Sequence, residues 1–412
     1  MRTSKTETID RAGGRYTIIS ADCHAGGSHS QYREYLDPKY LDDFDAWRGK
    51  YRNPYKDLGD QRRYRNWDDE MRNSQQEADG IVGEVVFPNT VPPFFPSFVL
   101  FAGPPRPEEY EHRLAGIRAH NRWLVDWCNE FPERRAGIGQ VFLNDVDDAI
   151  DDVKWIKEHG LRGGVLIPNI PPDATWLEPL FSKRYEPFWS ACEDLDIPVT
   201  THGGTGAPNY GREPVAQLLY ITEVRFYGQR PFVHLLLSGV FERHPRLKFV
   251  MTEMGGAWLH TVLPELDRTL AQIRNTGETG EIKYSAEHVL PKSATEYFHQ
   301  NCWVGVSFAG PADVGLRKEI GMDRFMWGSD YPHDEGTWPF TREHLRQVMS
   351  DVDPVEVQQL LGGNAAKLYD FDMEKLAPLA AQYGPTVAEV STPLDQLPDN
   401  ANQALLRHAG KL

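Results

Sequence analysis

Asp22 and His24 are the first residues of the chain whose types and spacing could do chemistry. They stand two residues apart at the end of residues 17–25, where apolar Ile18 and Ile19 and flanking glycines predict a buried strand. In an extended backbone such residues point to the same side, so the carboxylate and the imidazole converge. This is the arrangement of two ligands for one metal ion, although a capped strand end explains a lone D-x-H triplet equally well.

Further residues of the same kind end later apolar runs of the chain. His202, Glu253 and Asp330 each close a short hydrophobic stretch. With Asp22 and His24 they make five residues able to bind a metal, and coincidence explains such a concentration of imidazole and carboxylate poorly. The sequence therefore predicts a metal site, if the ends of these runs meet in space.

His333 lies three residues after Asp330 in the stretch Gly328-Ser329-Asp330-Tyr331-Pro332-His333. It could donate a proton or hold Asp330 in place. A purely structural role for His333 is nearly as well supported. Glu253 could bind the metal or act as a general base, and its alternative is a carboxylate paired with a neighbouring arginine.

The elements that must position these residues are eight short apolar runs, nearly all followed by a helical segment. The predicted strands cover residues 17–25, 83–88, 136–143, 164–167, 197–202, 247–253, 303–307 and 325–330. Eight such units predict an α/β fold, a (β/α)8 TIM barrel, whose strands end at one common mouth. A doubly wound sheet would normally carry a glycine-rich phosphate turn after its first strand, and Ala-Gly-Gly-Ser at 25–28 is no such turn.

Three segments depart from the barrel pattern of residues 16–371. Residues 1–15 predict a polar tail. Residues 26–75 are dense in Tyr, Trp, Arg and Asp without a clear period, which predicts a lid inserted after strand 1. Residues 372–412 predict a C-terminal extension that wraps a neighbouring subunit or stays partly disordered.

Candidate substrate-binding residues come from the lid and from an aromatic cluster. Arg62 and Arg63 could hold a substrate carboxylate through paired hydrogen bonds, although a solvated run of charges is the commoner explanation. Trp258 is one of 11 tryptophans and could wall an aromatic pocket, with core packing as the alternative.

The composition limits the partners of the protein. The formal net charge of −16 argues against nucleic acid, and no apolar run approaches the ~18 residues that a membrane span needs. Four widely separated cysteines argue against a disulfide framework and favour a reducing cytoplasm. We expect a small-molecule substrate and a homodimer or higher homo-oligomer.

Several motifs together resemble the amidohydrolase superfamily, in its amidohydrolase-related branch with aminocarboxymuconate-semialdehyde decarboxylase and the resorcylate-type decarboxylases. The resemblance covers most of residues 18–370. It is carried by Asp22-Cys23-His24, Thr201-His202-Gly203-Gly204, residues 238–247, residues 328–333 and the closing stretch 364–369.

The resemblance implies metal ligation by Asp22, His24, His202 and Asp330. Such a ligand set suits Zn²⁺ best, with Mn²⁺ or Fe²⁺ possible. Two departures matter: Asp22 takes a place that the family often fills with His or Glu, and Glu253 stands where relatives commonly carry a catalytic His.

The leading functional hypothesis is a metal-dependent hydrolase. Water activated by the metal would attack an amide, ester or related carbonyl, and Asp330 or Glu253 would take its proton. The alternative is a non-oxidative decarboxylase, in which the metal binds a carboxylate and an adjacent hydroxyl while an acid protonates the ring carbon. Arg62 and Arg63 favour this alternative, and the missing strand-six His disfavours it. A binding protein on an inactive barrel has the least support, because every expected ligand is present.

Overall fold

Eight parallel strands form one sheet in the order β1-β2-β3-β4-β5-β6-β9-β10. The computed structural model describes residues 9, 12–52, 61–97, 102–285 and 288–412. The strands are β1 (Ile18–Ala25), β2 (Ile81–Pro88), β3 (Arg135–Gln140), β4 (Gly164–Leu166), β5 (Val199–His202), β6 (Phe249–Thr252), β9 (Cys302–Ser307) and β10 (Phe325–Gly328).

The sheet closes between its first and last strands. Just beyond β10, the Asp330 N–H donates to the Asp22 carbonyl at 2.8 Å, and the His24 N–H donates to the Tyr331 carbonyl at 2.7 Å. Cys23 and Tyr331 form a parallel bridge at the same place. The predicted TIM barrel is therefore confirmed.

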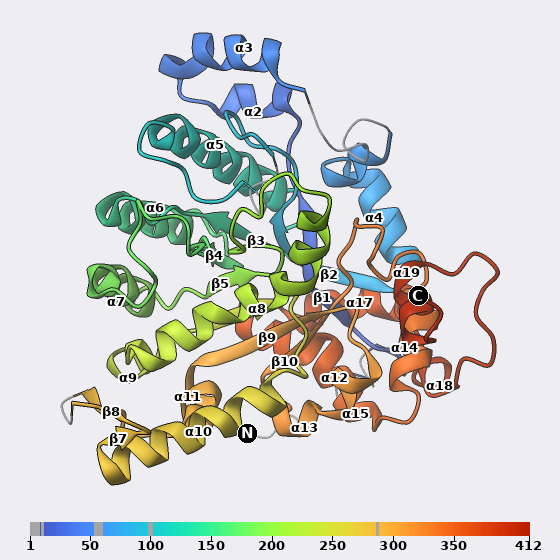
Figure 1. The fold of residues 1–412 in the computed structure, drawn as a ribbon. Helices are drawn as coiled ribbons and strands as arrows, with labels where there is room; N and C mark the ends of the chain where they lie inside the picture. Colours follow the sequence, from blue (N-terminus) through green and yellow to red (C-terminus); the bar gives the residue numbers. More distant parts are fainter. Residues whose placement is uncertain (1–8, 10–11, 53–60, 98–101, 286–287) are drawn as a thin grey trace.

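Helices surround the strands on the outside, and Figure 1 shows α5, α6 and α7 stacked along one side. Those that follow strands are α5 (Tyr110–Asn129), α6 (Val146–Glu158), α7 (Glu186–Asp194), α8 (Val215–Leu237), α9 (Val240–Arg243), α10 (Leu259–Thr276), α11 (Ala294–Asn301), α12 (Pro311–Gly315), α13 (Arg317–Ile320), α14 (Thr341–Met349) and α15 (Pro354–Gln358). Shorter elements are η3 (Lys183–Tyr185) and a two-stranded ribbon, β7 (Glu278–Thr279) with β8 (Ile282–Lys283). None of the helices in the described ranges is both long and apolar enough to cross a membrane.

The far end of the barrel, away from the strand C-termini, is closed by the last part of the chain. The closing elements are η5 (Gln359–Gly363), α16 (Asn364–Tyr369) and α17 (Met373–Tyr383). The chain continues into α18 (Val387–Val390) and α19 (Gln403–His408), and α19 lies toward the strand C-termini, where His408 contacts the Phe308 carbonyl. Phe371 and Leu376 are buried in one cluster with Ile19 and Val82 from the starts of β1 and β2. The described C-terminal extension therefore folds onto its own barrel.

The insertion between β1 and β2 contains α2 (His29–Tyr35), η1 (Pro38–Tyr40), α3 (Leu41–Lys50), η2 (Gln61–Asn66) and α4 (Asp69–Ala78). Leu36, Tyr40 and Phe44 pack with Ala115 and Ala119 of α5. Figure 1 accordingly shows α2 and α3 beside α5. A covering role of the insertion stays a prediction, and part of the predicted lid, residues 53–60, lies outside the described residues, as does most of the predicted N-terminal tail.

A buried ion pair joins α4 of this insertion to the barrel. The Arg72 guanidinium donates to both carboxylate oxygens of Glu84 on β2, and Gln76 donates to the same carboxylate at 3.0 Å. The Glu84 carboxylate also lies 3.6 Å from Arg135. A further Arg72 N–H donates to the His24 carbonyl at 2.8 Å, so the pair also contacts the backbone of a candidate ligand.

We expect Glu84→Gln to lower the free energy of unfolding by about 3–5 kcal/mol, because it leaves the buried Arg72 guanidinium without its counter-charge. Urea denaturation measures this change. Asp45→Asn, which breaks an exposed pair with Arg33, is the matched control and is expected to leave the free energy of unfolding close to that of the wild type. A Glu84→Gln variant no less stable than this control would contradict the assignment.

Candidate metal and catalytic site

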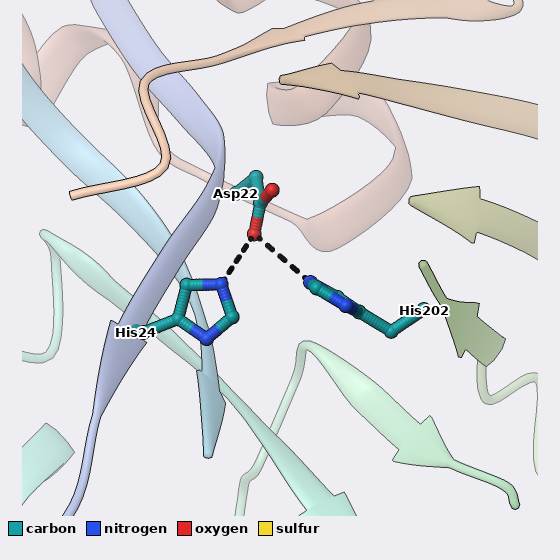
Figure 2. Close-up of side chains that lie close together, drawn as sticks. All are labelled: Asp22, His24 and His202. Carbon is teal, nitrogen blue, oxygen red and sulfur yellow. Dashed lines mark ion pairs between the residues drawn. The ribbon is translucent and has the colours of Figure 1, made fainter. Parts of the chain in front are cut away.

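Asp22, His24, His202 and Asp330 meet at the mouth of the barrel, and all four side chains are buried. Asp22 Oδ1 lies 3.2 Å from His24 Nε2 and 3.5 Å from His202 Nε2. Asp330 Oδ1 lies 3.2 Å from His24 Nε2. Figure 2 shows the Asp22 carboxylate between the two imidazole rings, with one oxygen facing both.

These atoms approach one another without forming hydrogen bonds. Asp22 Oδ1, His24 Nε2, His202 Nε2 and Asp330 Oδ2 are all buried and have no hydrogen-bond partner. Buried polar atoms almost always have a partner, so a group from outside the chain is expected to supply one. Two ligands at roughly 2.0–2.2 Å from one ion, at tetrahedral or octahedral angles, are separated by roughly 2.8–3.6 Å. The residues present therefore fit a divalent cation.

Hydrogen bonds on the opposite edges of the ligands set their orientation. His24 Nδ1 lies 3.3 Å from the Pro88 carbonyl, and His202 Nδ1 lies 2.9 Å from the Gly203 carbonyl. With the proton on Nδ1, each ring presents the lone pair of Nε2 to the shared space. The Ser307 hydroxyl donates to Asp22 Oδ2, which turns Oδ1 toward the two imidazoles.

The backbone at two of the site residues is strained. Glu253 and Asp330 have φ angles of 59° and 61°, a region that residues other than glycine rarely adopt. A Cβ atom on Gly203 would fall 2.3 Å from the Glu253 carbonyl oxygen, so only glycine fits beside this turn. Such strain persists only where the surroundings enforce it, which supports a functional role for both carboxylates.

Glu253 and His333 lie next to the four candidate ligands. Glu253 Oε2 is 3.3 Å from His202 Nδ1, and its side chain is 22% exposed. This contact is with an imidazole, which speaks against the arginine pairing considered above. His333 Nδ1 is 2.8 Å from Asp330 Oδ1, and its Nε2 is 3.1 Å from Asn89 Oδ1.

The charges of these groups shift their proton affinities. Desolvation, followed by the nearby Asp330 carboxylate, raises the pKa of Glu253 to about 8. Burial opposes protonation of His333, but the charge of Asp330 outweighs it and raises the pKa of His333 to about 10. Burial also works against ionisation of Asp22, yet His202 and His24 hold its pKa well below the usual range. The free site therefore keeps ionised carboxylates that a cation would neutralise.

The structure places the other predicted residues further out. Arg62 is exposed and pairs with Asp334, the neighbour of His333, at 3.1 Å. Arg63 lies beside Tyr64 and lines a cavity under α2 and α3. The Trp258 ring packs against Phe232 at 5.9 Å between centroids. Binding of substrate by Arg62, Arg63 or Trp258 stays a prediction.

Two residues of the site were missed by the sequence reasoning. Glu335 lies close to Glu253 and Asp330. The sequence could have indicated Glu335, because it lies on the same loop as His333, two residues further along the chain. Ser307 ends β9, and a polar residue at a predicted strand end was the same signal that identified Asp22 and His202.

Fold and site together define a TIM-barrel protein with imidazoles and carboxylates gathered at the strand C-termini. The family model described as amidohydrolase matches residues 22–371, and the chain belongs to this family. The resemblance noted in the sequence is thereby confirmed, and the protein is an enzyme of the amidohydrolase superfamily.

Relatives of known activity include the γ-resorcylate decarboxylase of Rhodococcus jostii (strain RHA1). It is 27% identical over 278 residues, which cover 64% of this chain and 79% of the relative. The γ-resorcylate decarboxylase of Rhizobium sp. (strain MTP-10005) is 24% identical over 266 residues, covering 62% and 76%. These relatives support the decarboxylase alternative better than the hydrolase hypothesis.

Solved structures of similar fold include 5-carboxyvanillate decarboxylase from Novosphingobium aromaticivorans DSM 12444, complexed with manganese. Its TM-score is 0.65 at 20% identity, and the match covers 86% of this chain and 96% of that one. Dihydroxybenzoic acid decarboxylase from Polaromonas sp. JS666, with bound manganese and 2-nitroresorcinol, gives a TM-score of 0.59 at 19% identity, covering 86% and 97%. Both contain manganese, so the expectation of zinc is not confirmed.

We expect His202→Ala and Asp330→Ala each to weaken metal binding by roughly 100-fold or more, since each removes a candidate ligand from the mouth and not from the stabilising half of the barrel. Metal content after dialysis against Mn²⁺ and the circular dichroism spectrum measure binding and fold. His260→Ala, which removes an exposed imidazole paired with Glu319, is the control. Unchanged metal content in both site variants would exclude this site.

Proposed function

We propose that the protein is a metal-dependent, non-oxidative decarboxylase of a hydroxylated aromatic acid. The observation that carries the proposal is the convergence of four buried, unpaired ligand atoms from Asp22, His24, His202 and Asp330. It is supported by the relatives of known activity, which release carbon dioxide from a dihydroxybenzoate, as their name states.

In this proposal the four residues hold one divalent cation. When bound, the ion acts as a Lewis acid toward the substrate's carboxylate and neighbouring hydroxyl oxygen. Two imidazoles and two carboxylates suit Mn²⁺ as well as Zn²⁺, and the manganese found in related structures favours Mn²⁺.

Glu253 is the proposed proton donor. Its carboxyl group stands at the edge of the cluster, 3.3 Å from His202 Nδ1, and its side chain is 22% exposed, whereas the four candidate ligands are buried. The bond between the ring carbon and the carboxylate carbon breaks, carbon dioxide leaves, and a proton from Glu253 takes its place on the ring carbon. Glu253 then recovers a proton from water. His333 holds Asp330 through its 2.8 Å contact and is a positioning residue in this scheme.

Product analysis separates this reaction from the hydrolysis that was first expected. The Mn²⁺-loaded enzyme is incubated with hydroxybenzoates, aryl amides and lactones, and the masses of the products are measured by mass spectrometry. We expect loss of carbon dioxide from at least one hydroxybenzoate. Addition of water to an amide or a lactone, with every benzoate unchanged, would refute the proposal.

Glu253→Gln tests the proton donor, because it keeps the shape of the side chain and removes the transferable proton. We expect kcat/KM to fall roughly 10²–10⁴-fold while bound metal stays at the wild-type level. A parallel loss of metal would make Glu253 a ligand instead. Glu319→Gln, at an exposed ion pair, is the control. Activity within about tenfold of wild type would remove Glu253 from the reaction.

A further inference from the structure

A small cavity of about 100 Å³ lies beside the candidate metal site, at the ends of β3 and β4. Its wall includes Gly204 and Thr205, two and three residues after His202. Asn169, another lining residue, donates to the His202 carbonyl at 3.4 Å and to the Thr205 hydroxyl at 2.5 Å. The cavity therefore shares a wall with the loop that carries a metal ligand.

Two buried amides in this wall lack hydrogen-bond partners. Gln140 is 2% exposed, and neither its Oε1 nor its Nε2 has a partner. Asn169 is 4% exposed; its Nδ2 is engaged as described, while its Oδ1 has no partner. An unpaired buried amide is costly, so these groups are expected to bond to something that enters the cavity. Together they offer one donor group and two acceptor oxygens.

The rest of the wall is apolar. It includes Phe142, Leu166, Ile167 and the ring of Tyr220, whose hydroxyl donates to the Gly204 carbonyl, and none of the described lining residues is charged. A charged substituent would lose its hydration here without gaining a partner. An engineered cavity of about 150 Å³ takes up a whole benzene ring. The present cavity is smaller, so it suits one edge of a ring with a single substituent.

We propose that this cavity is a subsite for an uncharged phenolic hydroxyl of the substrate, bound by the side-chain amide of Gln140 together with Asn169 Oδ1. A hydroxyl both donates and accepts, which matches the unpaired atoms on the wall. The inference rests on the proposed function, and it narrows the substrate to aromatic acids that carry such a hydroxyl apart from the groups held at the metal.

Gln140→Met is the central variant, because methionine has a similar shape and no amide. In a site built to bond a hydroxyl, loss of that bond costs roughly tenfold or more in affinity. The variant should unfold at the same temperature as the wild type or higher, since it removes an unpaired buried amide from the free protein. Gln347→Met, on α14, is the control for the same exchange at a partly buried position.

The first experiment measures binding of phenol and toluene to the Zn²⁺-loaded enzyme by saturation-transfer NMR. The quantity compared is the affinity for phenol divided by the affinity for toluene. We expect this ratio to be about tenfold higher in the wild type and in Gln347→Met than in Gln140→Met. Mn²⁺-loaded enzyme should then enhance the relaxation of phenol protons in wild type and lose this effect in Gln140→Met. An equal preference in all three proteins, or a marked loss of stability in Gln140→Met, would overturn the subsite.

The second experiment compares decarboxylation of dihydroxybenzoates with that of the matching methyl-hydroxybenzoates. We expect wild type to favour the dihydroxy member of at least one pair roughly tenfold or more, and Gln140→Met to abolish the difference. Phenol preference without any carbon dioxide release would refute the proposed function and leave the subsite standing. Carbon dioxide release with no discrimination in either experiment would refute the subsite alone.

Discussion

Closure of the barrel between β1 and the segment after β10 is the contact on which the site depends. Two backbone hydrogen bonds, Asp330 N–H to Asp22 carbonyl and His24 N–H to Tyr331 carbonyl, join positions some 300 residues apart in the chain. They bring the carboxylates of Asp22 and Asp330 to the same imidazole. The side chains of the site are thus placed by main-chain geometry, which small changes in packing elsewhere do not disturb.

Bringing these groups together is unfavourable in the free protein. Asp22 and Asp330 place two ionised carboxylates in a buried space beside Glu253, and Asp330 and Glu253 adopt strained backbone conformations. Neighbouring imidazoles offset part of the repulsion, as the directions of the pKa shifts show. A cation that binds only the folded state would stabilise it in proportion to its concentration and affinity. In the proposed function, part of the stability that the free site lacks would be supplied by the bound ion.

The fold and the placement of Asp22, His24, His202 and Asp330 could be predicted because both follow from local rules. Alternating side chains give the spacing of Asp22 and His24, and the ends of parallel strands share one mouth. Gln140 escaped notice because the apolar run continues to Leu143, whereas β3 ends at Gln140 itself.

Other features depend on long-range contacts that no local rule describes. The packing of α2 and α3 on α5 relies on a few aromatic and aliphatic residues without periodicity. The direction of proton transfer at Glu253 was also out of reach, because a carboxyl group serves as an acid or a base according to its surroundings. The relatives, and not the residue type, shifted the balance from hydrolysis toward decarboxylation.

The hydrogen bond from Arg72 to the His24 carbonyl sets α4 apart from α2 and α3, the other helices of the insertion. Helices α2 and α3 pack on α5, and α2 also bonds to the segment after β2, where Tyr32 contacts the Thr90 hydroxyl and His29 the Val91 carbonyl. Helix α4 donates through Arg72 to the main chain of a candidate metal ligand, so a shift of this helix would move that ligand. Substitutions on α4 are therefore expected to reach the candidate site more directly than substitutions on α3, which packs on α5 and Phe94.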